Sequence, residues 1–138
     1  MKFTQKQIDE LTYKIIGCAI EVHRNLGPGL LESVYEKCFL KELTLQKIDY
    51  KSQVWIPVCY KGIELDAGLR LDVLVEDSIL VELKAVEYLL AIHEAQLLTY
   101  MKLVKKPKGI LINFNCTNIF KDGQKTLVNH LYRDLPLF

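Results

Sequence analysis

Two charged residues interrupt an apolar stretch of the sequence at residues 80–85. Glu82 and Lys84 alternate there with Leu80, Val81 and Leu83, which are typical of a buried strand. Charged side chains are rarely buried unless they are paired or bind a metal ion. Because side chains on one face of a strand recur at every second residue, Glu82 and Lys84 are expected on the same face. The sequence therefore predicts an acid and a base side by side in an otherwise apolar strand.

A second acidic residue is expected to face Glu82 from the preceding strand. The segment 68–75 also alternates with period two, and residues 76–78 between the two segments are typical of a turn. A hairpin centred on that turn pairs Asp72 with Glu82, with their Cβ atoms about 5 Å apart. Two carboxylates at that separation need a proton or a cation, and a divalent ion that binds through oxygen fits the pair.

The groups around the two acids admit two interpretations. Strict alternation divides the segment 68–75 into two faces, one with Arg70, Asp72 and Leu74 and the other with Leu69, Leu71 and Val73. A structural interpretation is a ladder of ion pairs in which Arg70 and Lys84 neutralise the acids. The functional interpretation is a metal-binding site, with Arg70 in contact with phosphate because its planar fork suits phosphate oxygens. These residues alone leave both interpretations open.

Polar residues elsewhere in the sequence also admit both a structural and a functional interpretation. Gln96 and Tyr100 share a helix face with His93 one turn earlier, so they either join a functional site or satisfy hydrogen bonds inside the core. Glu32 lies in the first turn of a helix that follows the sequence GPG. Its favourable interaction with the helix dipole is a sufficient structural explanation for an acid at that position.

Basic and aromatic residues are the candidates for contacts with nucleic acid. The lysine-rich segment 102–108, which begins with Lys102, predicts either a phosphate-binding patch or a solvated helix end. Trp55 and Tyr60 are able to stack on bases, although aromatic residues in strands are more often part of a core.

The periodicity along the chain predicts the elements that position these residues. Helices are expected at 4–26, with a capping box of Thr4 and Gln7, and at 30–45, with Leu31, Val34, Cys38 and Leu45 in the core. Strands are expected at 52–60, with Pro57 at an edge or a bulge, and at 68–75 and 78–86. A helix at 88–106, a buried strand at 109–114 and a weaker segment at 125–133 follow. This order predicts an α/β fold with one domain over residues 1–138.

Composition favours a cytoplasmic globular protein and argues against several kinds of site. The chain has 138 residues, half of them hydrophobic, and a formal net charge of +1, so no overall field attracts it to nucleic acid or to a membrane. Its four cysteines are dispersed without a C-x-x-C pair, which argues against a zinc knuckle or an iron–sulfur cluster and suits a reducing compartment. The amino-terminal segment is too polar for a signal peptide, and no apolar run approaches the length of a membrane span.

Five ordered blocks of the sequence resemble the GxxExxY protein family of the PD-(D/E)XK nuclease superfamily. The name-giving motif is present as Gly29-Leu30-Leu31-Glu32-Ser33-Val34-Tyr35. The blocks, in the order of that family, are EVHRNLGPGLLESVYE, GLRLDVLVED, VELKAVE, IHEAQLLTY and LLTYMKLVKKPKGILINFN. The resemblance extends from the first helix to about Gly123. It implies a restriction-endonuclease-like core with a mixed, mainly four-stranded sheet flanked by helices.

The resemblance also implies an activity and a set of site residues. The active centre of the superfamily corresponds here to Glu32, Asp72, Glu82 and Lys84, and the Q-x-x-x-Y element of its RecB-like members to Gln96 and Tyr100. The implied activity is a nuclease that acts on DNA, or on RNA, with Mg²⁺ or Mn²⁺ bound by Asp72, Glu82, the Leu83 carbonyl and Glu32. Substrate contacts are expected from Arg70, Tyr100 and Lys102. Leu71 replaces the proline of the literal PD motif.

Two other functions stay open beside the nuclease. A non-catalytic module with the same fold would bind nucleic acid or a protein, and a structural metal would only join the strands. Retention of Asp72, Glu82 and Lys84 favours catalysis, because apolar groups can replace an idle buried ion pair at little cost. A domain of this size has little room for a substrate-specificity element, so a homodimer or a larger protein partner is also considered.

Overall fold

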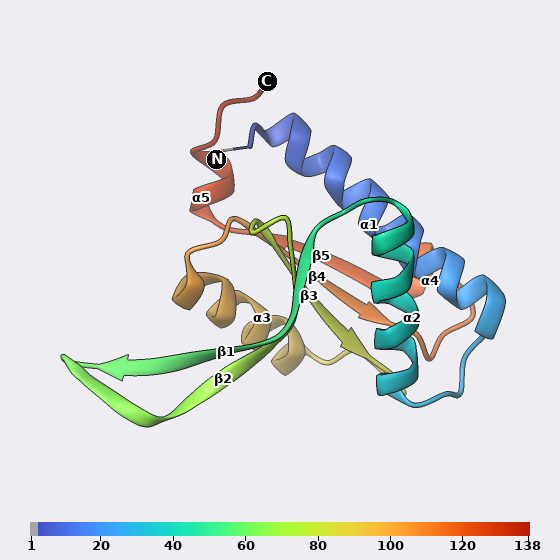
Figure 1. The fold of residues 1–138 in the computed structure, drawn as a ribbon, viewed down its shortest axis with the longest axis horizontal. Coiled ribbons are helices and arrows are strands. Elements are labelled where there is room, and N and C mark those ends of the chain that lie inside the picture. Colours follow the sequence, from blue (N-terminus) through green and yellow to red (C-terminus); the bar gives the residue numbers. More distant parts are fainter. Residues whose placement is uncertain (1–2) are drawn as a thin grey trace.

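Ten helices and strands make up residues 3–138, the part of the chain that the structure, a computed structural model, describes (Figure 1). In chain order they are α1 (Gln5–Leu26), α2 (Glu32–Leu45), β1 (Tyr50–Tyr60), β2 (Ile63–Val75), β3 (Ile79–Lys84), α3 (Ala91–Val104), β4 (Lys108–Asn113), α4 (Ile119–Asp122), β5 (Gln124–Val128) and α5 (His130–Arg133). The predicted α/β class is confirmed, and the weaker segment at 125–133 divides into β5 and α5.

The strands form one mixed, open sheet of five strands in the order β1-β2-β3-β4-β5. β3 and β4 are parallel and are joined through α3, whereas the other neighbours are antiparallel. α1 and α2 pack on one face, where Ile15 and Phe39 share a core with Val81. α3 packs on the other face, where Leu97 shares a second core with Leu80. The central strand β3 is therefore covered on both faces.

α1 begins and ends where the sequence predicts. The Thr4 hydroxyl accepts a hydrogen bond from the Gln7 N–H at 3.1 Å, and the Gln7 side chain accepts one from the Thr4 N–H at 2.9 Å, which confirms the capping box. The helix ends at Leu26, and Gly27 follows with a φ of 70°, a conformation that favours glycine. Among residues 3–138, no helix combines the length and the apolar composition that a membrane span requires.

The core face of α2 differs from the prediction. Leu31, Val34 and Leu45 are exposed and Cys38 is only half-buried, whereas Tyr35, Phe39 and Leu43 are fully buried. The buried residues recur every four positions, and the large aromatic rings, rather than the predicted aliphatic stripe, fill the space against the sheet. Tyr35 stacks on Phe114 with ring centroids 4.5 Å apart. Its hydroxyl donates to the Gly27 carbonyl at 2.6 Å and accepts from the Leu30 N–H at 3.1 Å, so it fixes the loop before Glu32.

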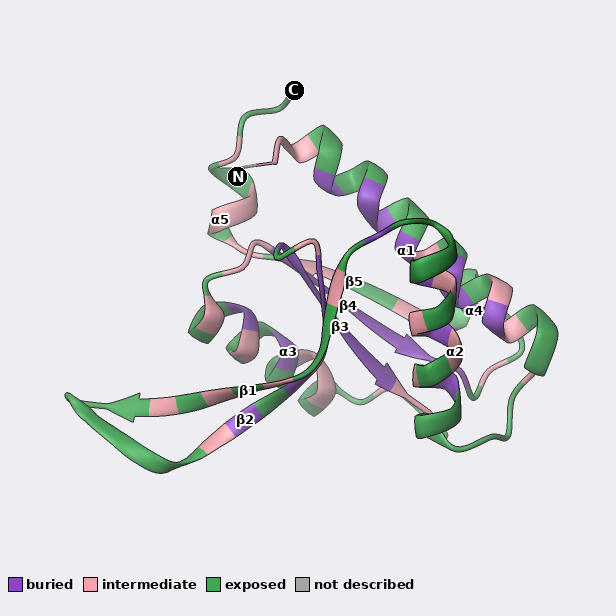
Figure 2. Ribbon diagram, viewed as in Figure 1, coloured by how far each residue is buried: buried purple, intermediate pink, exposed green. Residues whose placement is uncertain are grey.

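β1 and β2 continue beyond the rest of the sheet as a two-stranded arm, defined here as residues 54–70 (Figure 1). β2 pairs with β3 only from Val73 onward, so the outer part of β2 pairs with β1 alone among the described residues. Figure 2 shows that most of the arm is exposed. β1 is an edge strand and its register shifts between Pro57 and Cys59, which confirms both positions predicted for Pro57.

The alternation of faces along β2 changes at Asp72, contrary to the prediction. Leu71 packs in the core beside α3, whereas Val73 packs in the core beside α1 and α2. Strict alternation would place these two side chains on the same face. Gln53 of β1, which lies between the residues paired with Val73 and with Leu71, has a φ of 52°, far outside the strand region. This local twist means that Arg70 and Asp72 do not share one continuous face.

Candidate functional site

The two predicted acids meet across the β2–β3 hairpin. Val73 pairs with Val81 and Val75 with Ile79, which is the register that places Asp72 opposite Glu82. The Asp72 carboxylate accepts a hydrogen bond from the Leu83 N–H at 2.9 Å, and the Glu82 carboxylate lies 3.4 Å from the Asp72 N–H. Each acid is therefore positioned by the main chain of the other strand. We call Asp72 and Glu82 the acid pair.

The acid pair is electrostatically unfavourable in the metal-free protein. Glu82 is only 6% exposed, and this burial, together with the charge of Asp72, raises the pKa of Glu82 to about 8. Lys84 favours the ionised form, but its effect is smaller than that of burial. A carboxyl group with this pKa is mostly protonated at neutral pH and needs a nearby cation to become ionised, and a divalent ion would supply that charge.

Lys84 ends β3 in a half-buried position next to the point where the chain leaves the sheet. Its carbonyl accepts from the Phe114 N–H at 2.9 Å, and it pairs with Asn113 of β4 in the register. Asn113 is buried, and its side chain donates to the Val86 carbonyl at 2.9 Å and accepts from the Val86 N–H at 3.0 Å. Asn113 thus fastens the chain just beyond Lys84. The sequence analysis missed this residue, although a polar residue at the end of the apolar run 109–114 was a usable signal.

Glu32 and Asp72 line a hollow of about 310 Å³. The residues around it are Glu32, Ser33, Glu36, Gln53 and Asp72. Burial and the charge of Asp72 raise the pKa of Glu32, and Lys84 partly opposes this effect. Glu36 was missed by the sequence analysis, although it follows Glu32 by one helical turn. It accepts from the Gln53 amide at 2.6 Å, and burial raises its pKa.

Gln96 and Tyr100 of α3 form a hydrogen-bonded pair next to the acids. The Gln96 amide donates to the Tyr100 hydroxyl at 2.9 Å. Burial and the charge of Glu82 raise the pKa of Tyr100, with a smaller effect from Asp72, so its hydroxyl lies within the field of the acid pair. His93 has a different place, because its Nδ1 accepts from the Leu90 N–H at 3.0 Å at the start of α3.

The two residues predicted as basic contacts, Arg70 and Lys102, are both exposed. Arg70 is exposed on the arm, opposite Trp55 in the register, and Lys102 is exposed in the last turn of α3. Two other lysines of the segment 102–108 are engaged in the fold. Lys106 pairs with Asp77 at 3.0 Å, and the buried Lys108 pairs with Asp9 at 3.0 Å. These two lysines therefore stabilise the fold.

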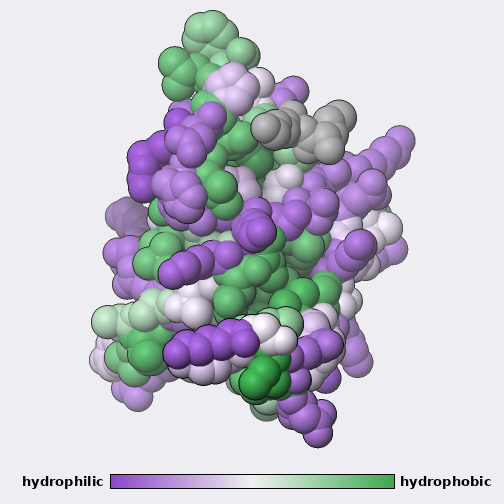
Figure 3. Space-filling model, turned by 90° about the vertical axis from the view of Figure 1, so that its left-hand side faces the viewer, coloured by the Kyte–Doolittle hydropathy of each residue, from purple (hydrophilic) through white to green (hydrophobic). Residues whose placement is uncertain are grey.

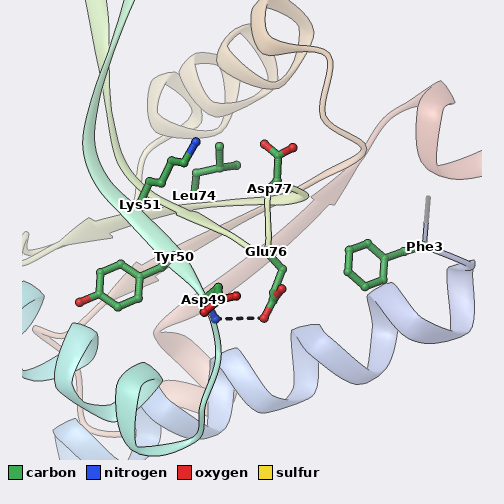
Figure 4. Close-up of a pocket in the computed structure, with 7 residues that line it drawn as sticks. All are labelled: Phe3, Asp49, Tyr50, Lys51, Leu74, Glu76 and Asp77. Atoms are coloured by element: carbon green, nitrogen blue, oxygen red, sulfur yellow. Dashed lines mark hydrogen bonds between the residues drawn. The ribbon is translucent and has the colours of Figure 1, made fainter. Parts of the chain in front are cut away.

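A separate hollow of about 290 Å³ lies at the β2–β3 turn (Figure 4). It is lined by Phe3, Asp49, Tyr50, Lys51, Leu74, Glu76 and Asp77. The Glu76 side chain accepts from the Asp49 N–H at 3.0 Å, and the Glu76 N–H donates to the Asp49 carbonyl at 2.9 Å. These bonds fasten the start of β1 to the hairpin, so Glu76 has a structural role away from the acid pair.

The donor set of the acid pair suits a hard divalent cation. Both side chains offer carboxylate oxygens, which Mg²⁺ and Mn²⁺ prefer, and the raised pKa of Glu82 reflects a charge that such an ion would stabilise. Within residues 3–138, no three side chains of Asp, Glu, His or Cys converge as a metal-binding group. An ion here would therefore depend on the pair itself, with water and main-chain oxygens as its other ligands.

The chain resembles known proteins in sequence and in fold. A family model of the PD-(D/E)XK nuclease superfamily matches residues 9–126. Among solved structures, the chain is similar to the crystal structure of SSO0001, with 18% sequence identity and a TM-score of 0.53. The match covers 74% of this chain and 55% of that chain, so it indicates a shared fold over little more than half of that structure. No curated protein sequence matches the chain. The match over most of its length shows that the chain belongs to the PD-(D/E)XK nuclease superfamily.

Proposed function

We propose that the chain is a nuclease that hydrolyses phosphodiester bonds in DNA or RNA with Mg²⁺ or Mn²⁺. The observation that supports this most directly is the acid pair, in which Glu82 is buried against Asp72 and has a pKa raised to about 8. A buried acid beside a half-buried one disfavours folding unless a cation offsets their repulsion, so a purely structural role explains them poorly. Membership of the GxxExxY family, based on the motif around Glu32, is part of the same proposal.

The acid pair binds the metal ion in this proposal. Asp72 and Glu82 supply carboxylate oxygens, the Leu83 carbonyl supplies a main-chain ligand, and Glu32 acts across the hollow through water. When bound, the ion lowers the pKa of a water molecule and stabilises the negative charge that develops on the phosphate.

The neighbouring side chains position the reactants. Lys84 orients the attacking water and stabilises the transition-state charge as a compact cation. Gln96 holds the Tyr100 hydroxyl beside the acids, where it shapes the site for the sugar–phosphate chain. Arg70 and Lys102, which are both exposed, bind phosphates next to the one that is cleaved.

The first test is calorimetric titration of Mn²⁺ into the wild type and into Asp72→Asn. We expect heat of binding in the wild type and none in the variant, because the substitution removes one of the two carboxylates. Asp66→Asn is the matched control, since Asp66 lies on the same strand but is exposed on the arm. It should bind the metal as the wild type does.

A second variant separates metal binding from catalysis. Lys84→Ala should keep the calorimetric signal and lose metal-dependent cleavage of single-stranded and duplex oligonucleotides, because Lys84 is no metal ligand in this scheme. No metal binding up to millimolar Mn²⁺, or full cleavage by Lys84→Ala, contradicts the proposal. Binding of oligonucleotides without any cleavage favours the non-catalytic module instead.

A further inference from the structure

Trp55 and Tyr60 of the arm are both exposed, although the sequence left open whether they belong to a core. Trp55, the single tryptophan of the chain, is 55% exposed and Tyr60 is 60% exposed, so neither belongs to a core. Apolar surface also appears in the lower part of Figure 3, where the arm points toward the viewer, with hydrophilic side chains around it. Side chains of this kind at the surface of a small protein suggest a binding role.

The backbone of β2 holds Trp55 in place. A Cβ at Gly68 would lie 2.7 Å from Cζ2 and 3.0 Å from Cε2 of the indole and would also overlap the Ile56 carbonyl. Only glycine therefore leaves room for the six-membered ring to lie across β2 at that point. The ring is supported by the strand and still half exposed. A surface aromatic that is fixed in this way loses little conformational entropy when a planar ligand stacks on it.

The surroundings of Trp55 connect this surface to the acid pair. Arg70 pairs with Trp55 across the arm, and Asp72 follows Arg70 by two positions, which is about 7 Å along a strand. At the tip of the arm, the Lys61 ammonium lies 5.4 Å from the centre of the Tyr60 ring. Aromatic rings beside cations, on an arm that adjoins the proposed phosphodiester-cleaving centre, match the chemistry of a nucleotide strand.

A protein partner fits the arm less well. Pro57 and the register shift next to it interrupt the free edge of β1, which hinders pairing with another strand. Complete coverage of Trp55, Tyr60 and Ile63 would remove only about 400 Å² from water, whereas a stable protein interface needs about 800 Å² per partner.

We propose that the arm binds the unpaired part of a nucleic-acid substrate, with a base stacked on Trp55 and the adjacent phosphate on Arg70. This inference rests on the proposed function, since it defines the substrate of the same centre as nucleic acid with a single-stranded segment. Bases of a duplex are stacked on one another and present no free face to Trp55, so a fully paired substrate cannot make this contact.

The test uses the fluorescence of Trp55, which has no other tryptophan to obscure it. An oligothymidylate of about 12 nucleotides is added to the full chain in a chelator, so that no cleavage occurs. We expect saturable quenching by the oligothymidylate and at least about ten-fold weaker quenching by a duplex of equal length.

Substitutions assign the binding to the arm. With a labelled oligonucleotide followed by anisotropy, Trp55→Ala should bind about ten-fold more weakly and Trp55→Phe should recover most of the affinity. Arg70→Ala should weaken binding and lower the salt dependence by about one phosphate contact. The control is Tyr13→Ala on α1, which removes an aromatic ring that is 81% exposed outside the arm and should change nothing.

The outcomes separate this inference from the proposed function. Wild-type affinity in Trp55→Ala, or equal quenching by single strand and duplex, overturns the role of the arm even if Asp72-dependent metal binding and cleavage are found. Dimerisation in sedimentation that is lost in Trp55→Ala, without quenching by oligonucleotides, also overturns it in favour of a second copy. Absence of metal binding with intact quenching rejects the proposed centre and supports the arm as a binding surface.

Discussion

The two halves of β2 have opposite surroundings although they belong to one strand. Residues 71–75 are buried except for Asp72, which is half-buried, whereas residues 63–68 are exposed or half-exposed and pair with β1 alone among the described residues (Figure 2). The inner half desolvates the acid pair and so raises the pKa of Glu82. Together with β1, the outer half forms the arm, on which Trp55, Tyr60 and Arg70 are exposed. The comparison shows that a change of face at Asp72 allows one strand to contribute both to the buried surroundings of the acid pair and to the exposed arm.

The largest expected effect is a loss of stability, and it should be large in the central sheet and small on the arm. Leu80→Ala removes a fully buried side chain of β3 and should lower the free energy of unfolding by about 2–5 kcal/mol. Leu65→Ala makes the same chemical change on the arm, where Leu65 is exposed, and should change it by less than about 0.5 kcal/mol. Urea denaturation followed by circular dichroism measures both. Equal losses of stability in the two variants would show that the arm is packed as tightly as the central sheet.

The pH dependence of stability should arise from Glu82, which lies next to the inner half of β2. Because the pKa of Glu82 is raised to about 8 by burial and by Asp72, the folded state binds more protons than the unfolded state between about pH 4.5 and 8. The metal-free protein should therefore lose stability as pH rises through this window. Glu82→Gln should remove most of this loss and be more stable than the wild type at pH 8 by roughly 4 kcal/mol, whereas the smaller contributions of Glu32 and Glu36 remain.

The control for this prediction lies on the arm. Glu64→Gln changes an exposed acid of β2 and should leave the pH profile of denaturation in chelator unchanged. A Glu82→Gln profile that falls as steeply as the wild-type profile between pH 5 and 8 would mean that another group causes the loss of stability.

Thiol reactivity should differ by about a hundred-fold between the two regions. Cys18 is buried in α1, and burial, with a smaller effect of Glu42, raises its pKa to about 11, so little thiolate exists at pH 8. Cys59 is exposed on the arm and should react rapidly with DTNB. The measurement is made in a Cys38→Ser, Cys116→Ser background. Rapid modification of both remaining thiols without denaturant would contradict the buried position of Cys18.

The smallest effect is expected at the boundary between the two regions. Gln53 has a φ of 52°, so Gln53→Gly should be more stable than Gln53→Ala by about 1 kcal/mol. Both variants lose the hydrogen bond from the Gln53 side chain to Glu36. The difference between their stabilities therefore reports the backbone conformation alone. Equal stability in thermal denaturation would show that the twist does not depend on this residue.

The elements that local residue types define were predictable from the sequence. The capping residues of α1 and the turn at 76–78 set the start of that helix and the register of the hairpin, and the structure confirms both. The pairing of Asp72 with Glu82 followed from that register alone. The roles assigned to Glu32, Lys84 and Arg70 stay predictions.

The features that depend on packing were not predictable. The left-handed conformation of Gln53 has no signal in its residue type, so strict alternation assigned Leu71 and Val73 to one face. The core face of α2 was wrong because Tyr35 and Phe39, rather than smaller aliphatic residues, fill the space against the sheet. The exposure of Trp55 follows from how far the arm extends beyond β3, which residue periodicity does not report.

The short connection between β2 and β3 also has a consequence for the order of folding. The bond from Leu83 to Asp72 joins residues only 11 positions apart, whereas the parallel pairing of β3 with β4 has to close a loop that contains α3. Contacts that are close in sequence form early because they lose less chain entropy. The repulsion between the two carboxylates therefore arises before the rest of the sheet is complete. A cation that binds them would speed the folding reaction itself, rather than only slow unfolding.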